Sequence, residues 1–152
     1  MKLLKYLIGL MAVTTLYSCD IPEYEKKEYP VLTNIVDTMW YSVDVKNQIY
    51  YDIYFYGESG MMVSFNSSER TEEIKRKAFT YTFTPATDKY DALVDVTFSN
   101  GKSYGGILIP KGHLQINNED VYLIQLYGLN DKGEVIYNEK GEVAESILMW
   151  KE

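Results

Sequence analysis

The side chains that commonly carry chemistry are scarce in this chain. It contains one histidine, His113, and one cysteine, Cys19. One residue of each type excludes Cys–His catalysis and the usual zinc sites, which need three or four such ligands. Two carboxylates that face away from the apolar side of their strands, Asp52 and Asp95, could in principle act as a glycosidase pair. With 22 acidic residues some pair always looks available, and we therefore predict no catalytic residue, no metal site, no cofactor and no enzymatic activity.

The aromatic residues give the best functional signal, because 15 residues are tyrosines. Tyr50, Tyr54 and Tyr56 fall on the side of their strand opposite the more apolar side. Tyrosine binds partners well, since it combines a broad ring with a hydroxyl at a low entropic cost. Its strand propensity alone would also explain its presence. If the fold encloses a cavity, the predicted ligand-binding residues are Trp40, Tyr51, Phe55, Tyr81 and Tyr104.

The elements that must position these side chains are strands. From residue 38 onward apolar residues recur with a period of two, which is typical of half-buried strands. The segment Phe79–Thr84 alternates aromatic residues and threonines without exception, and Ala92–Phe98 alternates apolar with polar residues over most of its length. Further strands are predicted at 39–45, 49–56, 61–66, 104–109, 113–117, 121–127 and 146–150, with a short one at 134–137.

Tight turns join these strands. Ser99-Asn100-Gly101-Lys102 is the strongest hairpin signal, because Asn-Gly tolerates the positive φ angles of a type I′ turn. The segment 130–135 recurs almost unchanged at 138–143, a period too short for a solenoid unit, which indicates two successive turns that each contain a glycine. The polar segment 66–77 lacks the period of two, and either a short helix or a polar hairpin loop would fit it.

A succession of eight or more short strands predicts an all-β antiparallel fold. No segment resembles a crossover helix, so a parallel sheet is excluded. A meander must protect its edges, and closure into a barrel removes them. The last predicted strand, 146–150, suits a strand that pairs with the first. We predict an up-and-down β-barrel of the lipocalin-like kind, with a two-sheet β-sandwich as the alternative.

The first residues have the parts of an export signal. Lys2 and Lys5 precede an apolar run that is too short to span a bilayer. The sequence Leu16-Tyr17-Ser18-Cys19 resembles the bacterial lipoprotein signal, in which the new N-terminal cysteine receives acyl chains. The resemblance implies that Cys19 is lipidated and holds the protein on a membrane. The predicted organisation is a signal peptide at 1–18, an acidic flexible tether at 19–36 and a β-barrel domain at 37–152.

The charge limits the partners. Removing residues 1–18 removes two lysines and no acids, so the formal charge changes from −7 to −9. Such an acidic domain gains nothing from phosphate backbones or anionic head groups, and we predict no nucleic-acid partner and membrane attachment through the acyl chains alone. The acids after Cys19 partly resemble a surface-export signal of Bacteroidetes lipoproteins. The expected location is therefore the outer membrane, with the domain facing either the periplasm or the cell surface.

Together, the Cys19 signal, Trp40 early in the first strand and the run of hairpins resemble small lipocalin-like lipoproteins of Bacteroidetes. Lipocalins begin with Gly-x-Trp, whereas this chain has Thr38-Met39-Trp40 and lacks the glycine. The resemblance implies a barrel with a ligand-binding mouth, and hence an envelope protein that holds a small apolar or glycan ligand. The alternative is a filled barrel that serves as a structural or protein-interaction module of the envelope.

Overall fold

The computed structural model of the protein describes residues 29–152, and eight of its strands form a closed barrel. Their order around the barrel is β1-β10-β9-β6-β5-β4-β3-β2, and all pairs are antiparallel. The up-and-down barrel is thus confirmed, in place of the alternative sandwich. The barrel strands are β1 (Thr38–Asp44), β2 (Ile49–Phe55), β3 (Ser59–Phe65), β4 (Glu73–Thr84), β5 (Ala92–Phe98), β6 (Ser103–Ile109), β9 (Tyr122–Leu129) and β10 (Ser146–Lys151).

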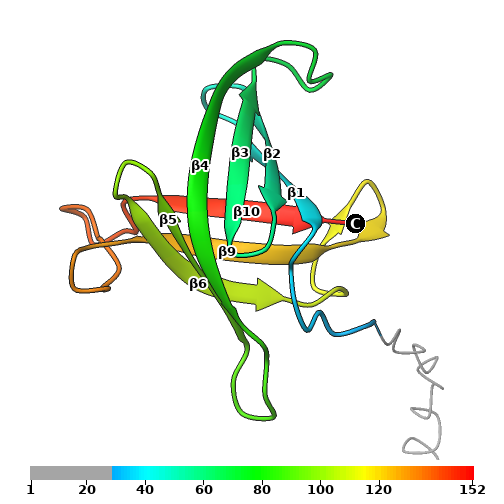
Figure 1. Ribbon diagram of the computed structural model, residues 1–152, viewed down its shortest axis with the longest axis vertical. Helices are drawn as coiled ribbons and strands as arrows, with labels where there is room; N and C mark the ends of the chain where they lie inside the picture. Colours follow the sequence, from blue (N-terminus) through cyan, green and yellow to red (C-terminus); the bar gives the residue numbers. More distant parts are fainter. Residues whose placement is uncertain (1–28) are drawn as a thin grey trace, which may run out of the picture.

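The barrel strands fall into two groups that cross each other (Figure 1). Strands β1–β3 run upright, whereas β5, β6, β9 and β10 run across them, and the long, bent β4 joins the two groups. At the opposite corner β1 and β10 pair at a single position, Tyr41 with Trp150. The hydroxyl of Ser42 adds a hydrogen bond of 2.7 Å to the carbonyl of Leu148. This corner is the weakest seam of the barrel wall.

The interior is filled by the side chains that alternate inward along each strand. In β5, Ala92, Val94, Val96 and Phe98 are buried and the three residues between them are exposed. A series of edge-to-face aromatic pairs runs through the core, with ring-centroid distances from 4.8 to 5.7 Å. The rings in this series are Tyr81, Phe55, Phe79, Phe98 and Tyr104.

One end of the barrel is closed by the chain that precedes β1. Ile35 is fully buried in the core, and Leu32 packs against it. The hydroxyl of Tyr122 donates to the carbonyl of Pro30 at 2.6 Å. Residues 29–36, the end of the predicted tether 19–36, therefore lie on the barrel and plug this end. The predicted signal peptide 1–18, Cys19 and the rest of the tether lie outside the described residues.

The polar segment 66–77 forms no helix. Its first part is the loop between β3 and β4, and strand β4 begins at Glu73. The segment loses the period of two because β4 extends past the core here, so that both of its faces meet water: every residue from Glu73 to Ala78 is exposed. The strand predicted at 113–117 shrinks to β7 (Gln115–Ile116), which pairs with β8 (Glu119–Asp120) through a turn at Asn117 and Asn118.

Three hairpin turns share one geometry. The hairpin at Ser99–Lys102 is confirmed, but only Gly101 has a positive φ, of 85°. Its amide donates to the carbonyl of Phe98 at 2.9 Å, which fits a type I turn followed by a glycine bulge and not type I′. The predicted eight-residue repeat consists of two such turns, in which Asn130 and Asn138 accept from the backbone amides of residues two and four positions later.

Candidate functional site

The end of the barrel opposite the plug is open. A cavity of about 580 Å³ lies there, within the range of small-molecule sites. It lies beside the corner where β1 and β10 part, and we call it the mouth. Inward side chains form its floor and the ends of the strands form its rim. Its lining comprises Ser42, Val43, Asp44, Val45, Tyr51, Met62, Lys77, Phe98, Asn100, Lys102, Tyr104, Ala144, Glu145, Ser146, Ile147 and Leu148.

Two of the predicted ligand-binding residues, Tyr51 and Tyr104, line this mouth. Tyr51 lies on β2 between Ser42 of β1 and Ser64 of β3, and its side chain is half-buried. Burial, and secondarily the charge of Asp44, raise the pKa of the Tyr51 phenol. The hydroxyl therefore stays protonated over the physiological range and serves as a hydrogen-bond donor in the mouth.

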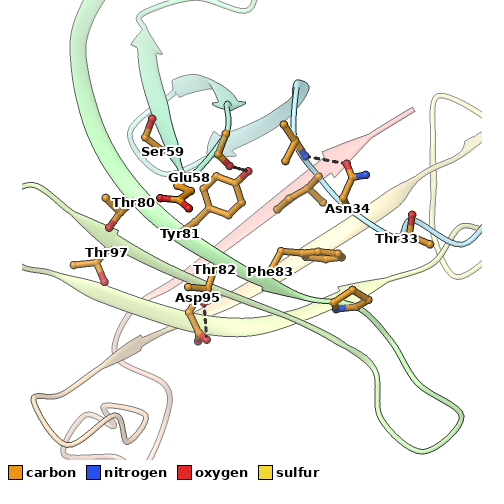
Figure 2. A pocket seen from close by; sticks show the side chains of 14 residues that line it. Thr33, Asn34, Glu58, Ser59, Thr80, Tyr81, Thr82, Phe83, Asp95 and Thr97 are labelled. Atoms are coloured by element: carbon orange, nitrogen blue, oxygen red, sulfur yellow. Dashed lines mark hydrogen bonds between the residues drawn. The ribbon is translucent and has the colours of Figure 1, made fainter.

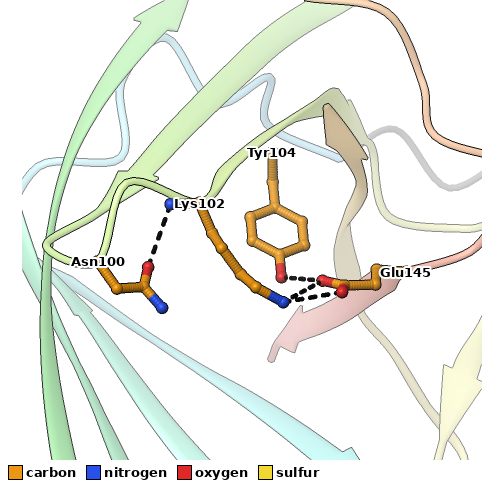
Figure 3. Close-up of polar contacts among 4 residues, drawn as sticks. All are labelled: Asn100, Lys102, Tyr104 and Glu145. Atoms are coloured by element: carbon orange, nitrogen blue, oxygen red, sulfur yellow. Dashed lines mark hydrogen bonds and ion pairs between the residues drawn. The ribbon is translucent and has the colours of Figure 1, made fainter. Parts of the chain in front are cut away.

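Tyr104 belongs to a polar network at the rim, with Lys102 and Glu145 (Figure 3). The Lys102 ammonium donates to both carboxylate oxygens of Glu145, at 2.8 and 3.0 Å, and the Tyr104 hydroxyl donates to Oε2 at 2.7 Å. The hydrogen bond from Lys102, and then the one from Tyr104, lower the pKa of Glu145. Burial, and then the bond to Glu145, raise the pKa of Tyr104. The network is a neutralised ion pair backed by a protonated phenol.

The fold places Glu145 there through the connection between β9 and β10. The Gly128 amide donates to the Glu145 carbonyl at 2.9 Å. A Cβ atom on Gly128 would lie 3.2 Å from the Cβ of Glu145 and 3.7 Å from a ring carbon of Tyr104. The glycine therefore lets the glutamate approach the barrel wall. Chemically, the mouth combines an aromatic and apolar floor with a rim of oriented donors and acceptors, which suits binding.

The other three predicted ligand-binding residues lie toward the plugged end. Trp40 and Phe55 are fully buried in the core, and the Trp40 ring nitrogen donates to the Thr38 hydroxyl at 2.8 Å. Tyr81 is also buried, and its hydroxyl donates to the carbonyls of Tyr56 and Gly57, at 3.0 and 2.8 Å. These side chains fill the barrel and do not line the mouth, because the plug closes the space on their side.

A second recess, of about 950 Å³, lies on the outside of β4 and β5 beside the plug (Figure 2). Its wall carries the outward hydroxyls of Thr80, Thr82 and Thr97, and Thr82 lies 3.4 Å from the carboxylate of Asp95. Tyr81 and Phe83 border it, with Asn34 from the plug segment. Most of its lining residues are exposed, so it is a broad solvated groove, whereas the mouth continues into the barrel.

The structure does not bring the candidate carboxylates together. Asp52 lies on β2 and Asp95 on β5, with β3 and β4 between them. The two strands that carry the carboxylates are therefore about 14 Å apart along the barrel wall. A glycosidase pair needs a separation of about 5–9.5 Å. His113 is exposed. Within residues 29–152 no cluster of three or more potential ligands could hold a metal ion. The same residues contain no helix with the length and hydrophobicity of a membrane span.

Two residues that make charged contacts, Glu145 and Arg70, were not singled out in the sequence analysis. Glu145 follows a turn-rich connection with no regular period, so its position beside Tyr104 depends on long-range pairing. Arg70 lies in the loop between β3 and β4, and its Nε donates to Asp52 at 2.5 Å. Asp52 itself, an acid on an otherwise aromatic strand face, was the available signal that a basic partner exists.

Comparison of the chain with models of protein families, with curated proteins and with solved structures found no match.

Proposed function

We propose that this chain is a lipid-anchored binding protein of the cell envelope, similar to small lipocalin-like lipoproteins, and that its barrel mouth holds a small apolar or glycan ligand. The observation that carries the proposal is the 580 Å³ mouth, lined by Tyr51, Tyr104 and the Lys102–Glu145 pair. A cavity with an aromatic floor and a few oriented polar groups is the usual form of a small-molecule site.

The anchoring part of the proposal rests on the sequence. The motif that ends in Cys19, the only cysteine, supports acylation at this residue and attachment to the outer membrane, with the domain facing the periplasm or the cell surface. Replacing Cys19 by Ala is expected to release the protein into the soluble fraction of lysed cells. Retention of the Cys19→Ala variant in the membrane fraction would contradict the lipid anchor.

Native mass spectrometry of the full lipoprotein, extracted gently from its own host, tests the ligand. We expect a bound mass that is lost when Tyr51 is replaced by Ala. A second expected result is retention of that mass in a Thr82→Ala variant, whose change lies in the outer groove. An apo mass alone, under conditions that preserve non-covalent complexes, would contradict a small-molecule ligand in the mouth.

A structural or protein-interaction module of the envelope is the second candidate. It is favoured by the dense filling of the other half of the barrel, where Trp40, Ile53 and Phe55 are fully buried. A purified apo protein that co-purifies with one envelope protein after crosslinking, in place of a small ligand, is the result expected for this candidate.

A further inference from the structure

Five aromatic side chains project from the outer surface of β1, β2 and β10 and from the residue after β2. They alternate with residues that point into the barrel, and the ladder places Tyr41 beside Trp150 on one side and beside Asp52 on the other. The ring centroids of Tyr41 and Trp150 are 6.3 Å apart, and those of Tyr54 and Tyr56 are 6.2 Å apart. We call Tyr41, Tyr50, Tyr54, Tyr56 and Trp150 the outer aromatic face.

This face differs from the outside of β4 and β5. There the outward residues include Thr80, Thr82, Thr84 and Thr97 and no aromatic residue, and Thr97 shares a hydrogen bond of 3.0 Å with Ser103 of β6. Threonine and tyrosine both suit strands, so strand propensity does not account for the separation of rings and hydroxyls onto different sides of one barrel. Apolar residues of β3 lie beside two of the rings as well, because Met61 pairs with Tyr54 and Phe65 pairs with Tyr50. Extended apolar surface of this kind commonly marks a binding site.

A neutral ion pair lies within the face. Asp52 is 7% exposed, and a carboxylate that is this buried needs its partner. Arg70 supplies it from the loop above, and its guanidinium carbon lies 4.9 Å from the centre of the Tyr41 ring. The Arg70 Nη1 also donates to the carbonyl of Ser68 at 2.9 Å, which holds the loop in place. The pair adds no net charge, and Arg70, whose side chain is 28% exposed, offers N–H donors among the rings.

We propose that the outer aromatic face binds a neutral glycan chain. A pyranose ring has a face of C–H groups and a rim of hydroxyls. The C–H groups are attracted to the negative faces of aromatic rings, and hydroxyls bond strongly to charged groups such as Arg70. Within the pairs Tyr41–Trp150 and Tyr54–Tyr56 the ring spacing is of the order of one sugar unit, which lets two adjoining units contact the two rings of a pair.

The face suits other partners less well. The formal charge of −7 for the whole chain repels polyanions and anionic lipid surfaces. Protein interfaces also favour Tyr, Trp and Arg, but their hot spots lie in well-packed pockets, and none of the five rings lines the mouth or the outer groove. This binding surface is separate from the mouth and goes beyond the function proposed above.

Affinity electrophoresis of the full chain in detergent tests the proposal. The native gels contain one soluble neutral polysaccharide each, a mixed-linkage β-glucan, a galactomannan or a xylan, with acidic polygalacturonate as the comparison. We expect at least one neutral polymer to retard the protein and polygalacturonate to have no such effect. Retardation by none of the neutral polymers, or by polygalacturonate alone, would overturn the proposal.

Matched variants locate the binding. The double replacement Tyr54→Ala and Tyr56→Ala is expected to weaken binding at least tenfold. The matched pair Thr80→Ala and Thr82→Ala, on the outer side of β4, two strands from β2, is expected to leave it unchanged, as is Tyr51→Ala in the mouth. If the double variant does not fold, Tyr56→Ala alone serves, because Tyr56 is 49% exposed. Undiminished binding in a folded Tyr56→Ala variant, or loss of binding in Tyr51→Ala, refutes a glycan site on this face. Native mass spectrometry tests the ligand in the mouth separately, and its result does not depend on glycan binding to the outer aromatic face.

Discussion

The two ends of this barrel are built by the same strands and differ in what those strands place inside. On β1 the inward residue is Trp40 near the plug and Ser42 near the mouth. On β3 and β4 the inward residues Met62 and Phe79 give way to Ser64 and Lys77 toward the mouth. Each of these strands therefore changes from apolar to polar along its inner side. This gradient, and not the alternation itself, distinguishes the open end of the barrel from the plugged end.

Among the variants that test the difference between the two ends of the barrel, Phe55→Ala is expected to lower the stability most. Phe55 is fully buried and makes edge-to-face contacts with Phe79 and Tyr81, at 5.3 and 4.8 Å between ring centroids. Truncation leaves a cavity and is expected to lower the free energy of unfolding by about 3–5 kcal/mol. Tyr51→Ala, on the same inner side of β2 but at the mouth, is expected to cost less than half as much. Urea denaturation measures both, and equal losses would mean that the ends are equally packed.

A smaller loss is expected from Ile35→Ala, which tests whether the plug belongs to the folded domain. Ile35 is fully buried although it precedes the first strand. Its truncation is expected to cost about 2 kcal/mol or more. Val36→Ala provides the control, because Val36 is 40% exposed. Unfolding free energies that are the same for Ile35→Ala and the unmodified protein would mean that residues 29–36 are not part of the cooperative unit.

The smallest expected effect is on the pH dependence of protein stability, through Glu145 at the rim of the mouth. The folded-state pKa of Glu145 lies below its ordinary value because Lys102 and Tyr104 donate to the carboxylate. Its contribution to stability is therefore present above the ordinary carboxyl pKa and is lost as the pH falls through the lower folded-state pKa. Glu145→Gln is expected to make stability depend less on pH in this acidic range. Unfolding midpoints measured across that range, with Glu142→Gln as the exposed control, test it, and identical pH profiles for the two variants would contradict the network.

The sequence predicted the architecture well because the alternation in residues such as Phe79–Thr84 depends only on local geometry. It predicted the site only in part. Tyr51 and Tyr104 lie in the mouth, whereas Trp40, Phe55 and Tyr81 are enclosed. The plug encloses them, and the sequence did not reveal the plug. Its buried residue, Ile35, precedes any strand pattern, and its position depends on tertiary packing. Charged residues at the start of β4 obscured that strand, because alternation disappears where both faces meet water.

Turn chemistry marks a second limit. The sequence predicts a type I′ turn at Asn100-Gly101, but a bulged turn forms instead. In the loop Ser99-Asn100-Gly101, the bulged turn needs a glycine only at the third residue. The dipeptide therefore defines the hairpin but not its geometry. Asn117 and Asn118 both adopt positive φ angles, of 53° and 66°, a combination that asparagine tolerates. This Asn-Asn pair was a usable signal for the hairpin of β7 and β8 that the periodicity did not reveal.

The hydrogen bond between Tyr122 and Pro30 limits how far the plugged end of the barrel can lie from a lipid anchor at Cys19. It fixes the N-terminal chain at the plugged end, opposite the mouth. If Cys19 carries the proposed anchor, only residues 19–28 connect it to that point, and ten residues span at most about 35 Å. The maximum reach of this segment is about equal to the width of the domain. With that anchor, the plugged end stays within this distance of the lipid, whereas the mouth, at the opposite end of the barrel, is free to lie farther from it.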